Sequence, residues 1–382
     1  MSPEGSSEST ANTGGRTRGS RHRGMPRFPW DSLATAGETA RAHPDGIVNL
    51  SVGTPVDPVP DVVRAALRAA DDSPGYPATH GTPELRAAAA AALARRHGVH
   101  GVAPEDVLPT IGSKEFVAWL PSLLGTRPGD TVVIPELAYP TYEAGARLAG
   151  AEIVRTEATH SLGPAGPAVL WLNSPSNPTG RVLPAEHLRK VVDWARERGT
   201  VVVSDECYLA LGWEAEPVSV LDPEVCGGSF EGLLAVHSLS KTSNFAGYRG
   251  GFVTGDPELV GELLELRKHA GMIVPRPVQD AMTAALSDDE HLREQRARYA
   301  ARRERLRPAL EEAGFRVDHS VAGLYLWASR EEDAWQTVRW LAERGILVAP
   351  GTFYGPEGQR HVRIALTASD ERIEAAVRRL RE

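Results

Sequence analysis

The sequence predicts an α/β fold, in which helices cover both faces of a mostly parallel sheet in one large domain. Apolar runs that suit buried strands alternate with amphipathic stretches through the middle of the chain. After about residue 270 the pattern changes to long helical segments with short strand-like runs, which predicts a smaller α+β domain. A chain of 382 residues is long enough for two such domains.

The expected elements follow from this pattern. Residues 184–199 predict a helix, because a proline suits its first turn and a glycine suits its end. In the second domain we expect helices at 291–313, at 333–344 and from about Asp370. Its expected strands are 324–328 and 361–366. The expected strands of the large domain are Thr131–Ile134, Glu152–Val154, Val169–Leu172, Val201–Val203, Leu233–His237 and Gly251–Thr254.

Changes in composition suggest where the domains begin and end. Residues 1–24 are rich in Ser, Gly, Thr and Arg and nearly lack large apolar side chains, which predicts a disordered tail. Residues 25–50 are expected to join the small domain. Residues 51–270 would then form the large domain, and 271–382 the small C-terminal domain.

Composition also excludes several classes of protein. The net charge of −8 provides no basic field for nucleic acid, and no apolar run is long enough to cross a membrane. Two cysteines, Cys207 and Cys226, are too few for a disulfide framework, so we expect a reducing, cytoplasmic location. Cys207 is expected to be a buried structural thiol rather than a nucleophile, and no metal site is expected.

Polar residues follow several predicted strands. Lys241 lies in Ser238-Leu239-Ser240-Lys241 after one strand, Asp205 follows another, and Asn177 lies in the turn after a third. Ligands of open α/β sheets bind at the carboxyl ends of the strands. A lysine at such an end, near hydroxyls and Arg249, suits a Schiff-base lysine held beside a phosphate. Taken singly, these residues could equally be a surface lysine, a helix cap, a turn and a solvated arginine.

Together with Val362-Arg363-Ile364-Ala365, these motifs resemble the fold-type I, pyridoxal phosphate (PLP) dependent aminotransferases of class I/II. The resemblance runs from about Phe28 to the C-terminus. It implies the PLP-transferase fold, with the large domain binding the cofactor. Each part of PLP then has a candidate partner in the chain.

The chemistry of the cofactor suggests the roles. Lys241 supplies the amine for the aldehyde, and Asp205 keeps the pyridine nitrogen protonated. Asn177 and Tyr208 can donate to the phenolic oxygen, and Tyr139 can stack on the ring. The phosphate would be held by Arg249, by the Ser238 and Ser240 region, and by the backbone N–H groups of Gly112, Ser113 and Lys114 at a helix N-terminus.

The resemblance adds a substrate site. It implies that Arg363 binds the substrate α-carboxylate, with Asn177 and the backbone of Gly53 beside the substrate. It also implies that Tyr76 reaches the PLP phosphate of a neighbouring subunit, so that the functional unit is a homodimer.

Further strings narrow the resemblance to the actinobacterial succinyldiaminopimelate aminotransferases. These strings are Asp57-Pro58-Val59-Pro60, Gly112-Ser113-Lys114-Glu115 with Trp119-Leu120-Pro121, Trp213-Glu214, and Leu347-Val348-Ala349-Pro350-Gly351. The implied reaction transfers an amino group between N-succinyl-LL-2,6-diaminopimelate and 2-oxoglutarate or glutamate, in lysine and diaminopimelate biosynthesis. A cation should meet the distal succinyl carboxylate, and Arg276, Lys268 and Arg27 are candidates.

Other functions stay open at this stage. The enzyme could be another class I/II aminotransferase of the aspartate or acylornithine type, or a PLP-dependent β-lyase or decarboxylase. A non-enzymatic regulator would need a DNA-binding segment, and the first 27 residues are too short and too polar to form one.

Overall fold

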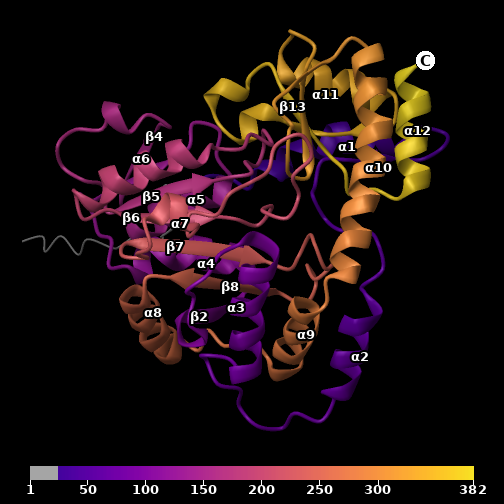
Figure 1. Cartoon of the computed structure of the whole chain (residues 1–382). Coiled ribbons are helices and arrows are strands. Elements are labelled where there is room, and N and C mark those ends of the chain that lie inside the picture. The colour runs from indigo at the N-terminus through magenta and orange to yellow at the C-terminus, as the bar shows by residue number, and fades with distance from the viewer. Residues whose placement is uncertain (1–24) are drawn as a thin grey trace, which may run out of the picture.

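A seven-stranded sheet forms the centre of the larger domain in the computed structural model, which describes residues 25–382 (Figure 1). The expected tail, 1–24, lies outside the described residues. The strand order is β2-β8-β7-β6-β5-β3-β4. Strand β8 is antiparallel to both of its neighbours, and the other pairs are parallel. The bounds are β2 Val107–Ile111, β3 Thr131–Ile134, β4 Glu152–Arg155, β5 Val169–Asn173, β6 Val201–Asp205, β7 Leu233–Ser238 and β8 Gly250–Gly255.

The six strands expected in this domain are confirmed, and β2 is an addition that the sequence did not predict. Proline interrupts the apolar run of β2 at Pro109, which lowers its strand signal. The structure accommodates this proline because β2 is an edge strand, paired only with β8 within the described sheet. A missing N–H is tolerated on the side of an edge strand that has no partner.

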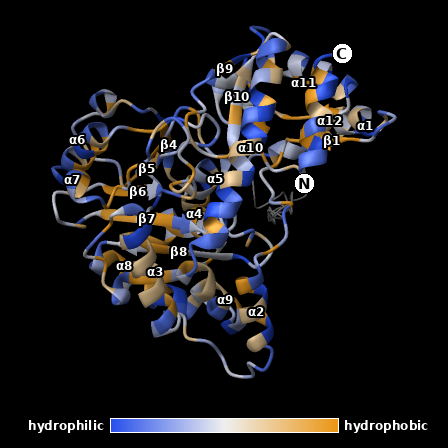
Figure 2. Cartoon of the chain, turned by 45° about the vertical axis from the view of Figure 1, so that its right-hand side comes forward, coloured by the Kyte–Doolittle hydropathy of each residue, from blue (hydrophilic) through white to orange (hydrophobic). Residues whose placement is uncertain are grey.

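Helices cover both faces of the sheet, and the strands form the apolar band between them (Figure 2). Side chains alternate along each strand, so Leu170 and Leu172 face one core cluster while Trp171 faces the other. One face packs against α3 (Pro83–His97), α6 (Ala185–Arg196) and α7 (Pro223–Cys226), with α2 (Asp61–Ala69) further out. The other face packs against α4 (Gly112–Leu123), α5 (Pro140–Ala149) and α8 (Pro257–Ala270). This arrangement confirms the predicted α/β class.

The second domain is an antiparallel sheet covered by helices, as the α+β prediction required. Its four described strands have the order β12-β13-β10-β9. The strands are β9 Arg316–Asp318, β10 Tyr325–Ser329, β12 Ala349–Pro350 and β13 Val362–Ala365. They pack with the helices α10 (Glu290–Glu312), α11 (Ala334–Glu343) and α12 (Asp370–Leu380).

The N-terminal segment packs with this second domain. Helix α1 (Ala34–Arg41) lies against α11, and β1 (Val48–Asn49) pairs in parallel with β11 (Ile346–Leu347). The buried side chains of Leu33, Val48 and Leu50 belong to the same apolar cluster as α10 and α12. The buried residues of this segment and those of the second domain therefore form one apolar core.

The core of the larger domain extends beyond the expected boundary at residue 270. Helix α9 (Arg276–Ser287) packs against α2 and α3, and its buried Val278, Met282 and Ala285 belong to the cluster beneath the large sheet. The division between the two cores therefore falls after α9, at the start of α10. The sequence pattern changes near residue 271, but it does not reveal which neighbour covers an amphipathic helix.

Arg302 ties α10 to the segment that precedes α2. Its buried guanidinium donates to both carboxylate oxygens of Asp57, and its Nε donates to Asp370 Oδ1 at 2.7 Å. Gln295 also donates to Asp57 Oδ2, at 2.8 Å. Burial alone would raise the pKa of Asp57, but the hydrogen bonds from Arg302 and Gln295 hold that pKa below its ordinary value. Among residues 25–382, no helix is both long and apolar enough to cross a membrane.

We expect Arg302→Ala to lower the free energy of unfolding by about 3 kcal/mol, because it leaves the buried Asp57 carboxylate without its cation. Urea denaturation measures the change. Arg305→Ala is the matched control. Arg305 also lies on α10 but is exposed, and it pairs with Glu374 of α12, so its substitution should leave the urea midpoint nearly unchanged. Equal effects of the two substitutions would contradict the role of Arg302.

Candidate active site

Three neighbouring parallel strands bring their carboxyl ends together. Asn173 and Asp205 are the last residues of β5 and β6, and they are directly paired in the sheet. Asn173 Nδ2 donates to the carbonyl of Asp205 at 2.9 Å, and Asn173 Oδ1 accepts from the backbone N–H of Asn177 at 2.7 Å. The Asn173 side chain thus links the turn containing Asn177 to β6, which ends in Asp205.

The Asp205 carboxyl is buried among neutral donors. Tyr142 donates its hydroxyl hydrogen to Asp205 Oδ2 at 2.7 Å, and the backbone N–H of Cys207 donates to Oδ1 at 3.2 Å. Burial raises the pKa of Asp205, and these hydrogen bonds oppose the rise. Within the described chain no basic side chain pairs with this carboxylate. A protonated nitrogen placed beside it would be strongly held.

Lys241 lies in the turn after β7 and reaches across to the N-terminal segment. Its amine donates to the carbonyl oxygen of Gly53. Burial lowers the pKa of Lys241, and the nearby Arg363 and Arg249 lower it further, so the neutral amine becomes easier to populate. The glycine at position 53 makes room for Tyr325 instead, because a Cβ atom there would lie 2.2 Å from the Tyr325 hydroxyl.

Arg249 meets the N-terminus of α4, as the phosphate prediction requires. A Cβ atom on Gly112 would lie 2.5 Å from Arg249 Nη2, and Gly112 has a φ of +69° that favours glycine. Helix α4 has no side-chain cap, and Gly112, Ser113 and Lys114 form its first turn. Free N–H groups beside a guanidinium form an anion site.

Arg363 is a buried cation with no carboxylate partner in the described chain. Its Nη1 donates to Asn177 Oδ1 at 2.9 Å and its Nη2 to the carbonyl of Ser51 at 2.8 Å, while Nε has no partner. The guanidinium carbon lies 3.9 Å from the ring centroid of Tyr325 and 5.0 Å from that of Tyr354. Only 3% of Arg363 is exposed, so a substrate carboxylate would neutralise a charge that the fold leaves unpaired.

The remaining predicted residues lie around these groups, with one exception. Tyr208 is buried beside Tyr325, Tyr139 packs edge-on against Tyr142 with ring centroids 5.8 Å apart, and Ser238 accepts the N–H of Ser240 at 3.2 Å. Lys114, predicted to contribute its backbone N–H, lies in the first turn of α4, and its side chain lies over the ring of Phe28.

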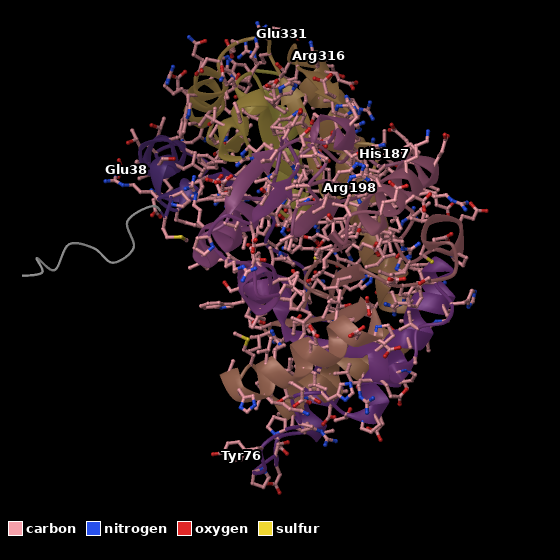
Figure 3. The ribbon with its side chains drawn as sticks, turned by 90° about the vertical axis from the view of Figure 1, so that its left-hand side faces the viewer. Glu38, Tyr76, His187, Arg198, Arg316 and Glu331 are labelled. Carbon is pink, nitrogen blue, oxygen red and sulfur yellow. The ribbon has the colours of Figure 1, made fainter. Side chains whose placement is uncertain are left out.

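Tyr76 is the exception, because this single chain does not bring it to the site. It is fully exposed in the loop between α2 and α3, and Figure 3 shows it at the lower tip of the molecule, pointing outward. The proposed cations for a distal carboxylate are also not brought to Arg363. Arg276 pairs with Asp280 at 2.9 Å and Lys268 with Glu265 at 2.6 Å, while Arg27 is exposed next to Phe28.

Several residues of the site were missed by sequence reasoning. Tyr142 could have been found, since it follows Tyr139 by one helical turn and would project near it. Nothing in the sequence separates Tyr325 from an ordinary core residue of a strand. Ser51 and Asn173 contribute through hydrogen bonds that only the folded chain reveals.

Comparisons with known proteins agree with this geometry. The family model "Aminotransferase class I and II" matches residues 45–380. A Mycobacterium tuberculosis protein named "Probable aminotransferase Rv1178" is 65% identical and covers 95% of this chain and 87% of its own length. The "4-dedimethylamino-4-oxo-anhydrotetracycline transaminase OxyQ" of Streptomyces rimosus is 61% identical over 94% of this chain and 99% of its own.

A solved structure is similar as well. The "probable N-succinyldiaminopimelate aminotransferase" of Thermus thermophilus superposes with a TM-score of 0.82 and 30% identity, covering 93% of this chain and 99% of its own. The chain belongs to the class I and II aminotransferase family. Enzymes of this family use PLP.

The residues present fit that cofactor. A buried carboxylate without a cation suits the pyridine nitrogen, a guanidinium at an uncapped helix N-terminus suits the phosphate, and Lys241 lies nearby to meet the aldehyde. Arg363 remains without an ionic partner among the described residues.

We expect Arg363→Lys to raise KM for both substrates by roughly 10- to 100-fold, because an ammonium cannot reproduce the two-pronged contact of a guanidinium with a carboxylate. Steady-state kinetics with glutamate and 2-oxoglutarate measures the change. Arg360→Lys, an exposed substitution close by in the sequence, is the control. An unchanged KM in Arg363→Lys would rule out the carboxylate role.

Proposed function

We propose that this aminotransferase exchanges an amino group between N-succinyl-LL-2,6-diaminopimelate and 2-oxoglutarate, within lysine and diaminopimelate biosynthesis in the cytoplasm. The proposal that the substrate is an amino acid rests on the buried, unpaired guanidinium of Arg363 beside Asn177. The choice of substrate is supported by the likeness to the T. thermophilus protein named for it and by the sequence strings quoted above. Proteins named LL-diaminopimelate aminotransferase are also similar, at 31% identity over 93% of this chain.

The chain's own residues divide the work. Arg363 binds the α-carboxylate and orients the Cα–H bond toward Lys241. Lys241, with its lowered pKa, takes the Cα proton as a base and returns a proton as an acid. Asp205 holds the proton of the pyridine nitrogen, and Tyr142 and the Cys207 N–H orient that carboxylate. PLP, when bound, supplies an aldehyde and a ring that accepts electrons.

The proposal includes a homodimer. Tyr76, exposed on its loop, would reach the PLP phosphate of a second copy, which accounts for a large aromatic side chain that packs against nothing within its own chain. The family supports dimerisation, and the location of Tyr76 is compatible with it.

A second candidate substrate is a ring ketone of the kind named in the S. rimosus relative. The side chains beside Arg363 favour a ring ketone as substrate, because these side chains are aromatic rather than cationic. The ring centroid of Trp30 lies 5.7 Å from the Arg363 guanidinium, and Phe353 packs on Trp30 at 5.2 Å. Flat rings pack well on such a surface. An aspartate- or acylornithine-type substrate, or a PLP β-lyase or decarboxylase reaction, would be recognised by analysis of the products.

We expect Lys241→Ala to reduce transamination by at least about 10³-fold, because the site loses its general base and acid. The assay follows glutamate formation from 2-oxoglutarate with the succinylated amino donor, and circular dichroism checks the fold. Lys190→Ala, at an exposed position on α6, should behave as wild type. Turnover near the wild-type rate in Lys241→Ala would show that the catalytic assignment is wrong.

Adding N-succinyl-LL-2,6-diaminopimelate to the holoenzyme should remove the visible absorbance band of the bound cofactor and raise the near-ultraviolet band of its aminated form. A half-reaction needs no second substrate, so the spectrum reports this compound alone. Glutamate serves as the positive control. A response to glutamate with none to the succinyl compound would support aminotransferase activity but contradict the proposed substrate. The ring ketone would then be the preferred substrate, and adding it to the aminated enzyme tests this.

A further inference from the structure

Tyr325 belongs to the second domain, yet its side chain touches three groups of the active site. Its hydroxyl lies 3.1 Å from the hydroxyl of Tyr208, and its ring lies 3.9 Å from the guanidinium carbon of Arg363. The hydroxyl also lies against the backbone of Gly53, where a Cβ atom would approach it to 2.2 Å. Tyr325 is only 4% exposed, so its hydroxyl faces these groups rather than solvent.

The two phenols can share only one hydrogen in their mutual bond. Within residues 25–382, neither hydroxyl has another hydrogen-bond partner. When Tyr325 donates, the hydrogen of Tyr208 is free to point into the site; when Tyr208 donates, it is not. The direction of this single bond therefore decides whether Tyr208 can act as a donor.

We propose that Tyr325 is a positioning residue that donates to Tyr208, directs the Tyr208 hydrogen toward the phenolic oxygen of the cofactor, and supports Arg363 with its ring. The proposal rests on the roles of Tyr208 and Arg363 in the proposed function. The guanidinium over the Tyr325 ring favours this direction, because a cation on the ring face polarises the phenol and strengthens its O–H as a donor. Within the described residues the Tyr325 hydroxyl is bonded to Tyr208 and not to the Gly53 carbonyl, which accepts from the amine of Lys241.

Several charged and titratable groups surround the Tyr208–Tyr325 pair. Burial raises the pKa of Tyr208, with Tyr325 and Cys207 adding to the rise and Arg363 opposing it, so Tyr208 stays a neutral phenol. Substituting either phenol by phenylalanine removes a hydroxyl without changing any formal charge. The charged and titratable groups around the pair are Lys241, Arg363, Cys207, Tyr139, Tyr299 and Tyr354.

The two contacts of Tyr325 can be separated by substitution. Tyr325→Phe keeps the ring on Arg363 and removes the hydroxyl, whereas Tyr325→Leu removes both. Tyr354→Phe is the matched control for the hydroxyl. Tyr354 is buried beside the same guanidinium, at 5.0 Å, and its hydroxyl has no hydrogen-bond partner in the described chain.

The experiment titrates the visible band of each holoenzyme with pH and measures KM for glutamate. In Tyr208→Phe the midpoint should rise, because the cofactor oxygen loses a donor. In Tyr325→Phe it should rise in the same direction by about half a pH unit, because Tyr208 loses the hydrogen bond that orients and polarises its O–H, with KM within about twofold of wild type. The double variant should match Tyr208→Phe, since Tyr325 acts through Tyr208. Tyr325→Leu should also raise KM, by roughly tenfold.

An unchanged midpoint in Tyr325→Phe would overturn the proposal, as would shifts that add in the double variant or an equal shift in Tyr354→Phe. Failure of the proposed function looks different. In that case the wild-type protein would show no titrating band, or Lys241→Ala would keep its activity, before any substitution at Tyr325 is considered.

Discussion

The parallel pairing of β5, β6 and β7 is the constraint on which the site depends. Parallel strands end at the same edge of a sheet, so the residues that follow them meet although they are far apart in the sequence. The register places Asn173 directly beside Asp205, and the turn after β7 carries Lys241 to the same edge. A one-residue slip in β6 would turn the Asp205 side chain to the opposite face and separate it from Tyr142.

Unpaired charge is the most distinctive property of the assembled site. The buried Asp205 carboxyl has only neutral donors, and the buried Arg363 has no carboxylate within the described residues. Other buried arginines are paired with carboxylates, as Arg302 with Asp57 and Arg267 with Glu115, or held by backbone carbonyls, as Arg379 is. An unpaired acid and an unpaired base in one site destabilise the fold unless ligands complete them.

The two domains share no continuous sheet; they meet through side chains and through backbone hydrogen bonds such as those from Ala322 to Gly180 and from Gly323 to Leu211. Arg363 from β13 binds Asn177 of the large domain and Ser51 of the N-terminal segment, and Tyr325 from β10 reaches Tyr208. A substrate bound at Arg363, as we propose, would contact both domains at once. Helix α10 runs alongside this junction (Figure 1), and Arg302 anchors it to Asp57 near the segment that holds Gly53. Any relative movement of the domains changes the distance between Arg363 and Lys241.

The sequence by itself determined the fold class, six strands of the large sheet and the set of strand-end residues, because buried strands and the polar residues after them are local patterns. It could not determine that Pro109 lies in an edge strand, that α9 packs beneath the large sheet, or that Tyr325 joins Tyr208 to Arg363. These facts depend on which surfaces meet in three dimensions. An amphipathic helix or a strand tyrosine has the same local pattern whichever neighbour covers it, and only the tertiary structure selects that neighbour.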